Sequence, residues 1–246
     1  MKEIEGFIIN EVPYKETSKI INIFTKDGLI GCIAKGAKSL KSNLRVNTTK
    51  YTYGKFIIKG TKDKLNILIE ANVIDDLKNI KEDLLTVSYL TYIVDLTYQV
   101  IKQTFDTDSI YELFINTILK LNEKLNPRVI SNIYELKILD YLGVGINFEC
   151  CSKCGSKKNI VTINGDVGGY LCNNCITNEI IYDNKTIKMI RLYYLIDIKT
   201  ISDLKISNEV INNIDYFINT YYDRYTGLYL KSKKFLKDID KLYSSI

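Results

Sequence analysis

The sequence contains no histidine and no tryptophan among its 246 residues. Without histidine the chain cannot build a Ser–His or Cys–His nucleophile, and imidazole is excluded both as a metal ligand and as a base near neutral pH. Any metal ion must therefore be held by cysteine or carboxylate side chains. The glycine-rich phosphate loops of ATPases and of dinucleotide-binding enzymes are also missing. We find no catalytic constellation, so the sequence predicts a protein that is not an enzyme.

Long apolar runs are missing as well. The N-terminus, MKEIEGFIINEV, alternates acidic residues with short apolar pieces and has no signal-peptide core. The longest uncharged run, residues 167–178, contains Gly, Asn and Cys and falls short of the roughly 18 apolar residues of a membrane-spanning helix. We therefore expect a soluble, cytoplasmic protein with no membrane span, and its length suits two or three domains.

Positive charge is concentrated in one segment, residues 34–64. This segment holds eight lysines and Arg45 against a single acidic residue, Asp63, whereas the whole chain carries a net charge of only +5. Residues 1–80 contain fourteen basic and nine acidic residues, and residues 81–246 contain twenty of each. A bias in overall composition would spread the excess evenly, so its localisation favours a binding surface over a merely solvated one.

Aromatic side chains lie among these charges, as they do on surfaces that bind single-stranded nucleic acid. Lys and Arg neutralise phosphates, and aromatic rings stack on bases with little regard to base identity. The alternative is that Tyr51, Tyr53 and Phe56 belong to a core. In a regular strand the two tyrosines share one face and Phe56 takes the other, so all three can be inside only if Gly54 forms a bulge. The candidate contacts are Lys35, Lys38, Lys41, Arg45, Lys50, Tyr51, Tyr53, Lys55 and Lys59.

Five β-rich segments occupy the first 75 residues, and no long helix separates them. Asp27-Gly28, between two of them, is typical of a hairpin turn because glycine tolerates a positive φ. The pattern fits a small closed or half-closed barrel, with the basic segment between the third and fourth strands. The expected strands are 6–10, 19–25, 29–34, 51–59 and 65–73.

Helical periodicity begins at residue 82. Asn126-Pro127 predicts a cap followed by proline in the first helical position, and Gly143 predicts the end of that helix. Asp108, Asp183 and Ser207 are expected to cap three further helices. The expected helices are 82–103, 109–121, 128–142, 184–197, 207–222 and 225–242.

The sharpest motif is a pair of C-x2-C hooks, Cys151 with Cys154 and Cys172 with Cys175, separated by seventeen residues. Each hook wraps half of a tetrahedral site, and four thiolates hold Zn²⁺ without histidine. Such a closed site leaves no position for a catalytic water, so we interpret it as one structural zinc ion. A thiol–disulfide redox pair is the alternative, but it would need one hook in a thioredoxin-like setting. Cys150 could replace Cys151; we prefer Cys151 and interpret Cys150 as a packed or spare thiol.

Three motifs, in order along the chain, resemble the RecO family of bacterial recombination mediators. They are GFIINEVPYKETSKIINIFTKDGLIGCIAKGAKSLKS, then ELKILDYLGVGINFECCSKCG with GGYLCNNC, and finally GLYLKSKKFL. The resemblance implies an α+β multidomain protein: an N-terminal OB-fold β-barrel, then an all-helical domain that carries a four-cysteine zinc-ribbon-like module. The expected boundaries are 1–80 for the OB-fold, 81–146 and 181–246 for the helical domain, and 147–180 for the zinc module.

The resemblance also implies a function in DNA repair and recombination. Members bind single- and double-stranded DNA, anneal complementary strands without ATP and, with RecR, load RecA onto strands coated by single-strand binding protein, in the cytoplasm at the nucleoid. The basic positions carried over are Lys35, Lys38, Lys41 and Arg45, with lysine where the family often has arginine, which weakens bidentate and stacked contacts. Two rivals remain: an RNA-binding OB-fold protein with a zinc ribbon, and a scaffold whose lysines only solubilise it.

Overall fold

The computed structural model describes residues 1–60, 65–202 and 204–244. The chain forms two compact units. The barrel unit comprises Met1–Asp83 and Phe105–Ile115, and the helical unit comprises Leu84–Thr104 and Asn116–Ile246. Across the described residues, no helix is both long and apolar enough to cross a membrane.

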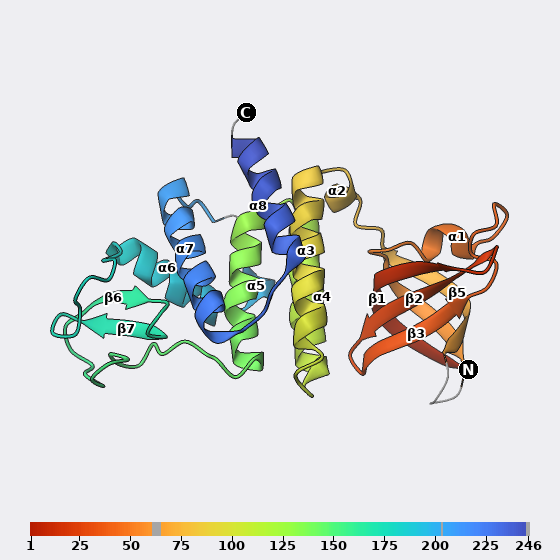
Figure 1. Cartoon of the computed structure of the whole chain (residues 1–246). Coiled ribbons are helices and arrows are strands. Elements are labelled where there is room, and N and C mark those ends of the chain that lie inside the picture. Colours follow the sequence, from red (N-terminus) through yellow and green to blue (C-terminus); the bar gives the residue numbers. More distant parts are fainter. Residues whose placement is uncertain (61–64, 203, 245–246) are drawn as a thin grey trace. The chain divides into compact units, whose positions relative to one another are not determined.

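The barrel unit is built on five strands that close on themselves (Figure 1). They are β1 (Lys2–Tyr14), β2 (Ser18–Thr25), β3 (Gly28–Ala34), β4 (Tyr53–Lys59) and β5 (Asn66–Asp75). The order is β1-β2-β3-β5-β4, and β4 pairs again with β1. All pairs are antiparallel except β3 with β5, which is parallel. The OB-like barrel expected from the sequence is confirmed, and its closure leaves no long free edge.

Alternation of side chains along the strands fills this barrel. Ile8, Ile21, Phe56 and Leu68 are buried in its core together with the thiol of Cys32. Burial without a polar partner raises the pKa of the Cys32 thiol to about 12, so this cysteine behaves as a small apolar side chain.

The hairpin expected at Asp27-Gly28 is present. Thr25 pairs with Gly28, whose φ is 103°, so the turn takes two residues between β2 and β3. The expected segment 6–10 covered only the apolar middle of β1. The strand continues on both sides because exposed charges such as Glu3 and Glu5 alternate with buried residues in its first half.

Two short helices in the barrel unit were not expected. The first, α1 (Leu44–Asn47), lies inside the basic segment, where Leu44 packs against the barrel core and the Asn47 side-chain amide donates to the Ala71 carbonyl at 2.8 Å. The second, α2 (Lys78–Lys81), follows β5. Each is about one turn long, so periodicity in the sequence cannot reveal it.

The first turns of α4 (Thr107–Asn122), up to Ile115, pack within the barrel unit. The ring of Phe114 meets those of Phe7 and Phe24 edge-on, with centroids 5.0 and 5.5 Å apart. Phe7 and Phe24 therefore fill the outer wall of the barrel beneath α4 and are not part of its interior.

The expected cap of α4 is wrong. Asp108 lies inside the first turn of the helix, and the carboxylate of Asp106 accepts the N–H of Ser109 at 3.2 Å. The helix starts at Thr107, two residues before the expected start, because Asp106 takes the capping role that was expected of Asp108. Asp108 still suits the first turn, where the helix dipole favours a negative charge.

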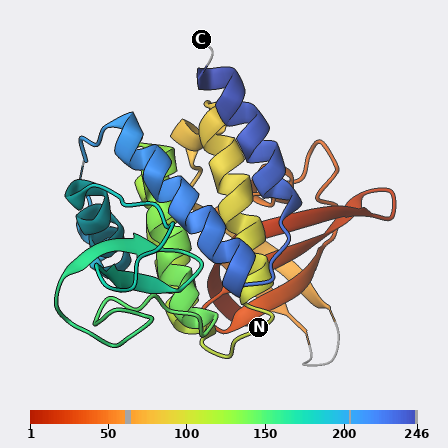
Figure 2. The same cartoon turned by 60° about the vertical axis from the view of Figure 1, so that its left-hand side comes forward.

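The helical unit is a bundle into which the zinc-ribbon-like module is inserted (Figure 2). The caps expected from the sequence are confirmed, because Asn126, Asp183 and Ser207 each accept backbone N–H groups of the helix that follows. Gly143, with a φ of 71°, follows the end of α5 (Pro127–Tyr141) as expected. The helices of the helical unit are α3 (Leu84–Val100), the rest of α4, α5 (Pro127–Tyr141), α6 (Asn184–Leu195), the 3-10 turn Ile198–Thr200, α7 (Asn208–Tyr225) and α8 (Lys231–Ser244).

The expected start of the last helix at residue 225 is wrong. Tyr225 ends α7, and α8 begins only at Lys231. Gly227, with a φ of 61°, lies in the connection, where its backbone adopts a conformation that continues neither helix.

Candidate metal centre and nucleic-acid interface

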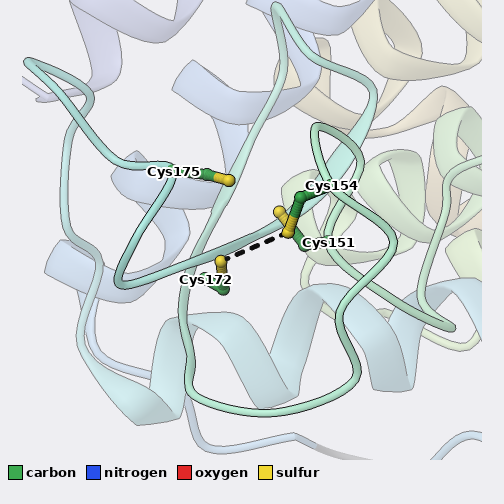
Figure 3. A group of neighbouring side chains, drawn as sticks. All are labelled: Cys151, Cys154, Cys172 and Cys175. Carbon is green, nitrogen blue, oxygen red and sulfur yellow. Dashed lines mark hydrogen bonds between the residues drawn. The ribbon is translucent and has the colours of Figure 1, made fainter.

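The four expected cysteines come together in the small module. The Sγ atoms of Cys151, Cys154, Cys172 and Cys175 all lie within 4.8 Å of one another, and their side chains point towards a common centre (Figure 3). The Sγ atoms of Cys154 and Cys172 are 3.6 Å apart. Four sulfur atoms at 2.3 Å from a zinc ion form a tetrahedron with edges of about 3.8 Å, so the spacing fits a metal site. It is far too long for a disulfide bond.

Two similar turns position the cysteines. In the first hook the N–H of Gly155 donates to the carbonyl of Cys151 at 2.8 Å, and Gly155 has a φ of 74°. In the second the N–H of Cys175 donates to the carbonyl of Cys172 at 3.0 Å. This positive φ favours glycine after the first hook, because a residue without Cβ adopts it without strain.

A two-stranded hairpin joins the hooks. β6 (Ile160–Asn164) pairs with β7 (Gly169–Cys172), which confirms the expected ribbon and ends on a metal-site cysteine. The buried apolar cluster beside the cysteines is small and contains Leu171 with Cys151 and Cys172, while Ile163 is buried on β6. Because this cluster is so small, a metal ion held by the four cysteines would add to the stability of the hairpin.

The thiols show why this cluster suits a cation. Burial raises the pKa of Cys151, but the backbone N–H groups of Cys172, Cys154 and Lys153 outweigh burial and lower it to about 6. The neighbouring thiols of Cys154 and Cys172 raise the pKa of Cys175 to about 12. Four thiolates so close together repel one another, and a divalent ion would remove that penalty. The donor set therefore fits a structural metal with soft ligands.

Cys150 does not join this cluster of described residues. Its N–H donates to the side-chain oxygen of Asn147 at 3.3 Å, and the Asn147 amide donates to its Sγ at 3.6 Å. Lys153 links the two hooks instead, because its ammonium donates to the Cys175 carbonyl at 3.1 Å and to Glu179 at 2.6 Å. That contact is the main reason why the pKa of Glu179 falls to about 2.

Four of the basic candidates lie together at one end of the barrel. Lys35, Lys38 and Lys41 are exposed in the loop after β3, and Arg45 is exposed on α1. None of the four makes an ion pair with a described residue. They are therefore available to a negatively charged ligand.

The loop is fastened to the turn between β1 and β2. The N–H of Lys38 donates to the Thr17 carbonyl at 2.8 Å, and the N–H of Gly36 donates to Ser18 Oγ at 3.3 Å. This brings exposed Lys15, in the same turn, to the same end of the barrel. Lys15 was not expected from the sequence, because it lies twenty residues before the loop and only the barrel topology places it there.

Lys50 and Tyr51 lie where the loop returns to the barrel. The ammonium of Lys50 is 4.6 Å from the centroid of the Tyr51 ring, and that ring is 6.2 Å from the ring of Phe7. Tyr51 is half-buried, and its N–H donates to the Ile8 carbonyl at 2.8 Å. One face of this tyrosine is thus engaged in packing against the barrel wall.

Tyr53 is held further from the loop. Its hydroxyl donates to the Glu5 carboxylate at 2.6 Å, and Tyr111 of α4 donates to the same carboxylate at 3.4 Å. Burial, with Glu5 second, raises the pKa of the Tyr53 hydroxyl. The β4–β5 register shifts between Tyr53 and Gly54, as expected for a bulge at Gly54. Phe56 is fully buried in the barrel core, whereas Tyr51 and Tyr53 are half-buried.

Lys55 and Lys59 lie on the outer wall of β4 and are exposed. Lys55 approaches Glu3 at 3.7 Å, so part of its charge is offset. Lys59 pairs across the sheet with Ile67, which in turn pairs with Ile33. Because neighbouring strands are about 4.8 Å apart, Lys59 lies roughly 10 Å from β3, two strands away from the start of the basic loop. Lys62 and Lys64 fall in residues 61–64, outside the described residues.

Comparison with known proteins covers both units. Residues 1–77 match the family described as Recombination protein O N terminal, and residues 81–234 match Recombination protein O C terminal. The DNA repair protein RecO of Bacillus cytotoxicus is 32% identical over 244 residues, which cover 98% of each chain. That of Listeria monocytogenes serotype 4b (strain CLIP80459) is 30% identical over 245 residues, 98% of this chain and 96% of the relative.

The barrel is thus followed by a helical unit that carries the four-cysteine module, as the resemblance implied, and the two family matches follow one another in the same order. The chain belongs to the RecO family of DNA repair proteins.

Proposed function

We propose that this protein is a recombination mediator that binds single- and double-stranded DNA through the barrel and anneals complementary strands without ATP. The observation that carries the proposal is the group of exposed cations Lys35, Lys38, Lys41 and Arg45, none of them paired with a described acidic residue. Phosphate contacts of this kind need no base recognition, so binding is expected to be largely independent of sequence.

The barrel wall suggests how a strand runs from this loop. Ile33 on β3 and Ile67 on β5 are half-buried and adjacent, and they lie between the loop and Lys59. A strand that crosses β5 would meet aliphatic surface flanked by cations at both ends. Lys neutralises phosphates as a point charge and does not impose the planar geometry of Arg, so two backbones can exchange partners on the same surface. Annealing by charge screening needs no nucleotide hydrolysis.

Family membership supports the remaining parts of the proposal. We assign RecR and single-strand binding protein as partners, and RecA as the protein loaded onto the strand, with the helical unit available for docking. The setting is the cytoplasm, at the nucleoid. We also assign the metal as one Zn²⁺ held by Cys151, Cys154, Cys172 and Cys175. When bound, it supplies a cross-link between the two hooks, and the strands of the module hold the thiolates in place.

A salt series tests the DNA site. Binding of fluorescent oligo-dT should weaken with salt along a log–log line, with a slope of about −0.7 for each phosphate contact on a single strand. The variant in which Lys35, Lys38, Lys41 and Arg45 become Glu removes four contacts, so the slope should flatten by about 2.8 and the affinity should fall by orders of magnitude.

Two control arms accompany this measurement. Circular dichroism and zinc content should be unchanged in the four-residue variant, since all four side chains are exposed. An RNA oligonucleotide of the same sequence separates the mediator from its RNA-binding rival. A variant that binds oligo-dT as the wild type does would refute the barrel site.

A further inference from the structure

The last helix, α8, presents an outer face whose composition differs from that of a merely solvated helix. Lys231 and Lys234 are exposed on it, and Lys237 is exposed at its edge, where it also lines the pocket on the inner side of the helix. Asp238 is the one exposed acid among the described side chains of α8. Lys231 and Lys234 are three residues apart, and Phe235 follows Lys231 by four, so these side chains are neighbours on the helix surface. The face therefore combines a concentration of positive charge with an aromatic ring.

Large apolar side chains are exposed beside these lysines. Phe235 is 50% exposed, and Tyr229, just before the helix, is 81% exposed. Leu242, seven residues after Phe235, continues the same stripe and is 62% exposed. Phe235 and Leu242 thus share one stripe beside the lysines, and exposed apolar patches with a polar rim are typical of interaction surfaces.

The opposite face of α8 already has its own contacts. Leu236 and Ile239 are buried, Ser232 Oγ donates to Asp95 at 2.6 Å, and Lys233 donates to Glu135 at 2.7 Å. Burial therefore holds the helix in one rotational setting. The exposed rings of Tyr229 and Phe235 do not contribute to the core, because other residues of α8 make its contacts with the rest of the helical unit.

We propose that the outer face of α8 is a second binding surface for single-stranded DNA, separate from the basic loop of the barrel. Lysines interleaved with exposed rings neutralise phosphates and stack bases, which is how sequence-independent single-strand surfaces work. The proposal rests on the function proposed above, and it assigns one strand to each unit of the same chain.

An acidic peptide is the competing occupant, and two observations disfavour it. The exposed cations of this face among the described residues are all lysines, whereas carboxylates are best bound by the planar fork of Arg. The face of a single helix is also convex, and the pocket beside α8 opens on its inner side, where Lys233, Lys237 and Asp240 contribute to the lining. A peptide anchored by apolar side chains needs a groove, but a flexible strand can follow a convex surface.

The test uses the full chain and two matched double variants. Lys231→Glu with Lys234→Glu reverses the charge of the α8 face. Lys185→Glu with Lys188→Glu makes the same charge change at the same spacing on exposed positions of another helix, α6. Donor- and acceptor-labelled oligo-dT strands, which cannot pair with each other, report simultaneous binding by energy transfer. Sedimentation of the same samples counts strands per chain and identifies dimers.

The wild type and the α6 variant should bind two strands per chain, and the α8 variant should bind one. In the background of the four Glu substitutions in the barrel, residual binding should show a salt slope near −1.4 from two lysines, and the α8 change should abolish it. Phe235→Ala should weaken this residual binding at least about fivefold, without change in the salt slope.

Three outcomes would overturn the second surface. These are two strands per chain in the α8 variant, an equal loss in the α6 variant, and tighter residual binding of oligoglutamate than of oligo-dT of equal charge. Failure of the barrel site is recognised separately. In that case the four Glu substitutions in the barrel would leave the strand assigned to the barrel bound. The comparison of the α8 variant with the α6 variant would still test the strand assigned to α8.

Discussion

The ion pair that fastens α8 to the helical unit gives a quantitative test of its packing. Glu135 on α5 has a side chain only 6% exposed, and Lys233 on α8 donates to it at 2.7 Å with 22% exposure. The hydroxyl of buried Tyr92 also donates to this carboxylate. The Lys233 ammonium lies 5.4 and 4.9 Å from the ring centroids of Tyr92 and Tyr222. A carboxylate in this position depends on its cation, because burial penalises an unpaired charge.

Lys233→Met keeps the aliphatic stem and removes the charge. Breaking a buried pair from one side costs about 3–5 kcal/mol, and we expect about 3 because Lys233 is partly exposed and Tyr92 still donates. At about 2–4 °C per kcal/mol for a unit of this size, the Tm of the full chain should fall by about 6–12 °C. Adding Glu135→Gln removes the stranded charge but keeps an acceptor for Tyr92, so the double variant should recover about 2 kcal/mol.

Urea and thermal unfolding followed by far-ultraviolet circular dichroism measure both effects. Lys234→Met is the matched control, because Lys234 is exposed on the next position of the same helix and should change stability by less than about 0.5 kcal/mol. The reasoning fails if Lys233→Met is no more destabilising than this control. It also fails if the loss in the double variant equals the sum of the two single losses.

Two further predictions concern the module and a helix cap. Cys154→Ser should release the metal, measured with a chromogenic chelator, and lower the Tm, whereas oligo-dT affinity through the barrel should change less than twofold because the thiolates cross-link only the module. Asp183→Ala should cost about 1 kcal/mol by removing the cap of α6. Thr186, through its hydroxyl and then its N–H, lowers the pKa of Asp183 below 3.8, so the charge-dependent part of this stabilisation is present above that pH and is lost as the pH falls below it. Asp183→Asn should keep the cap at pH 7 and lack this loss in acid unfolding curves.

Local signals were sufficient for much of the fold. The two-residue turn at Asp27-Gly28 and the caps at Asn126 and Asp183 are decided by the conformations and hydrogen bonds of residues close together in the chain. The arrangement of the four cysteines is also largely local, because the C-x2-C spacing sets half of a tetrahedral site in each hook. For these features the chain has few alternatives, and the sequence alone predicts them.

Errors appeared where burial decides between alternatives. α8 was expected to start at residue 225, but apolar residues at helical spacing continue across Gly227 and hide the break. The contact of Tyr53 is also beyond local pattern, because its hydroxyl is bonded to Glu5, forty-eight residues away; its role in stacking stays a prediction. A periodic pattern reports which face is apolar, and it does not report what that face meets.

By itself, the sequence determined the strands, the metal-site cysteines, the main helix caps and the concentration of positive charge, because each depends on neighbours within a few residues. Only the tertiary structure decided the parallel pairing of β3 with β5 that closes the barrel, the place of Lys15 beside the basic loop, and the pairing of Glu135 with Lys233. These contacts join residues far apart in the chain. Their free energy comes from burial that exists only once the barrel and the bundle have formed, so no local pattern carries it.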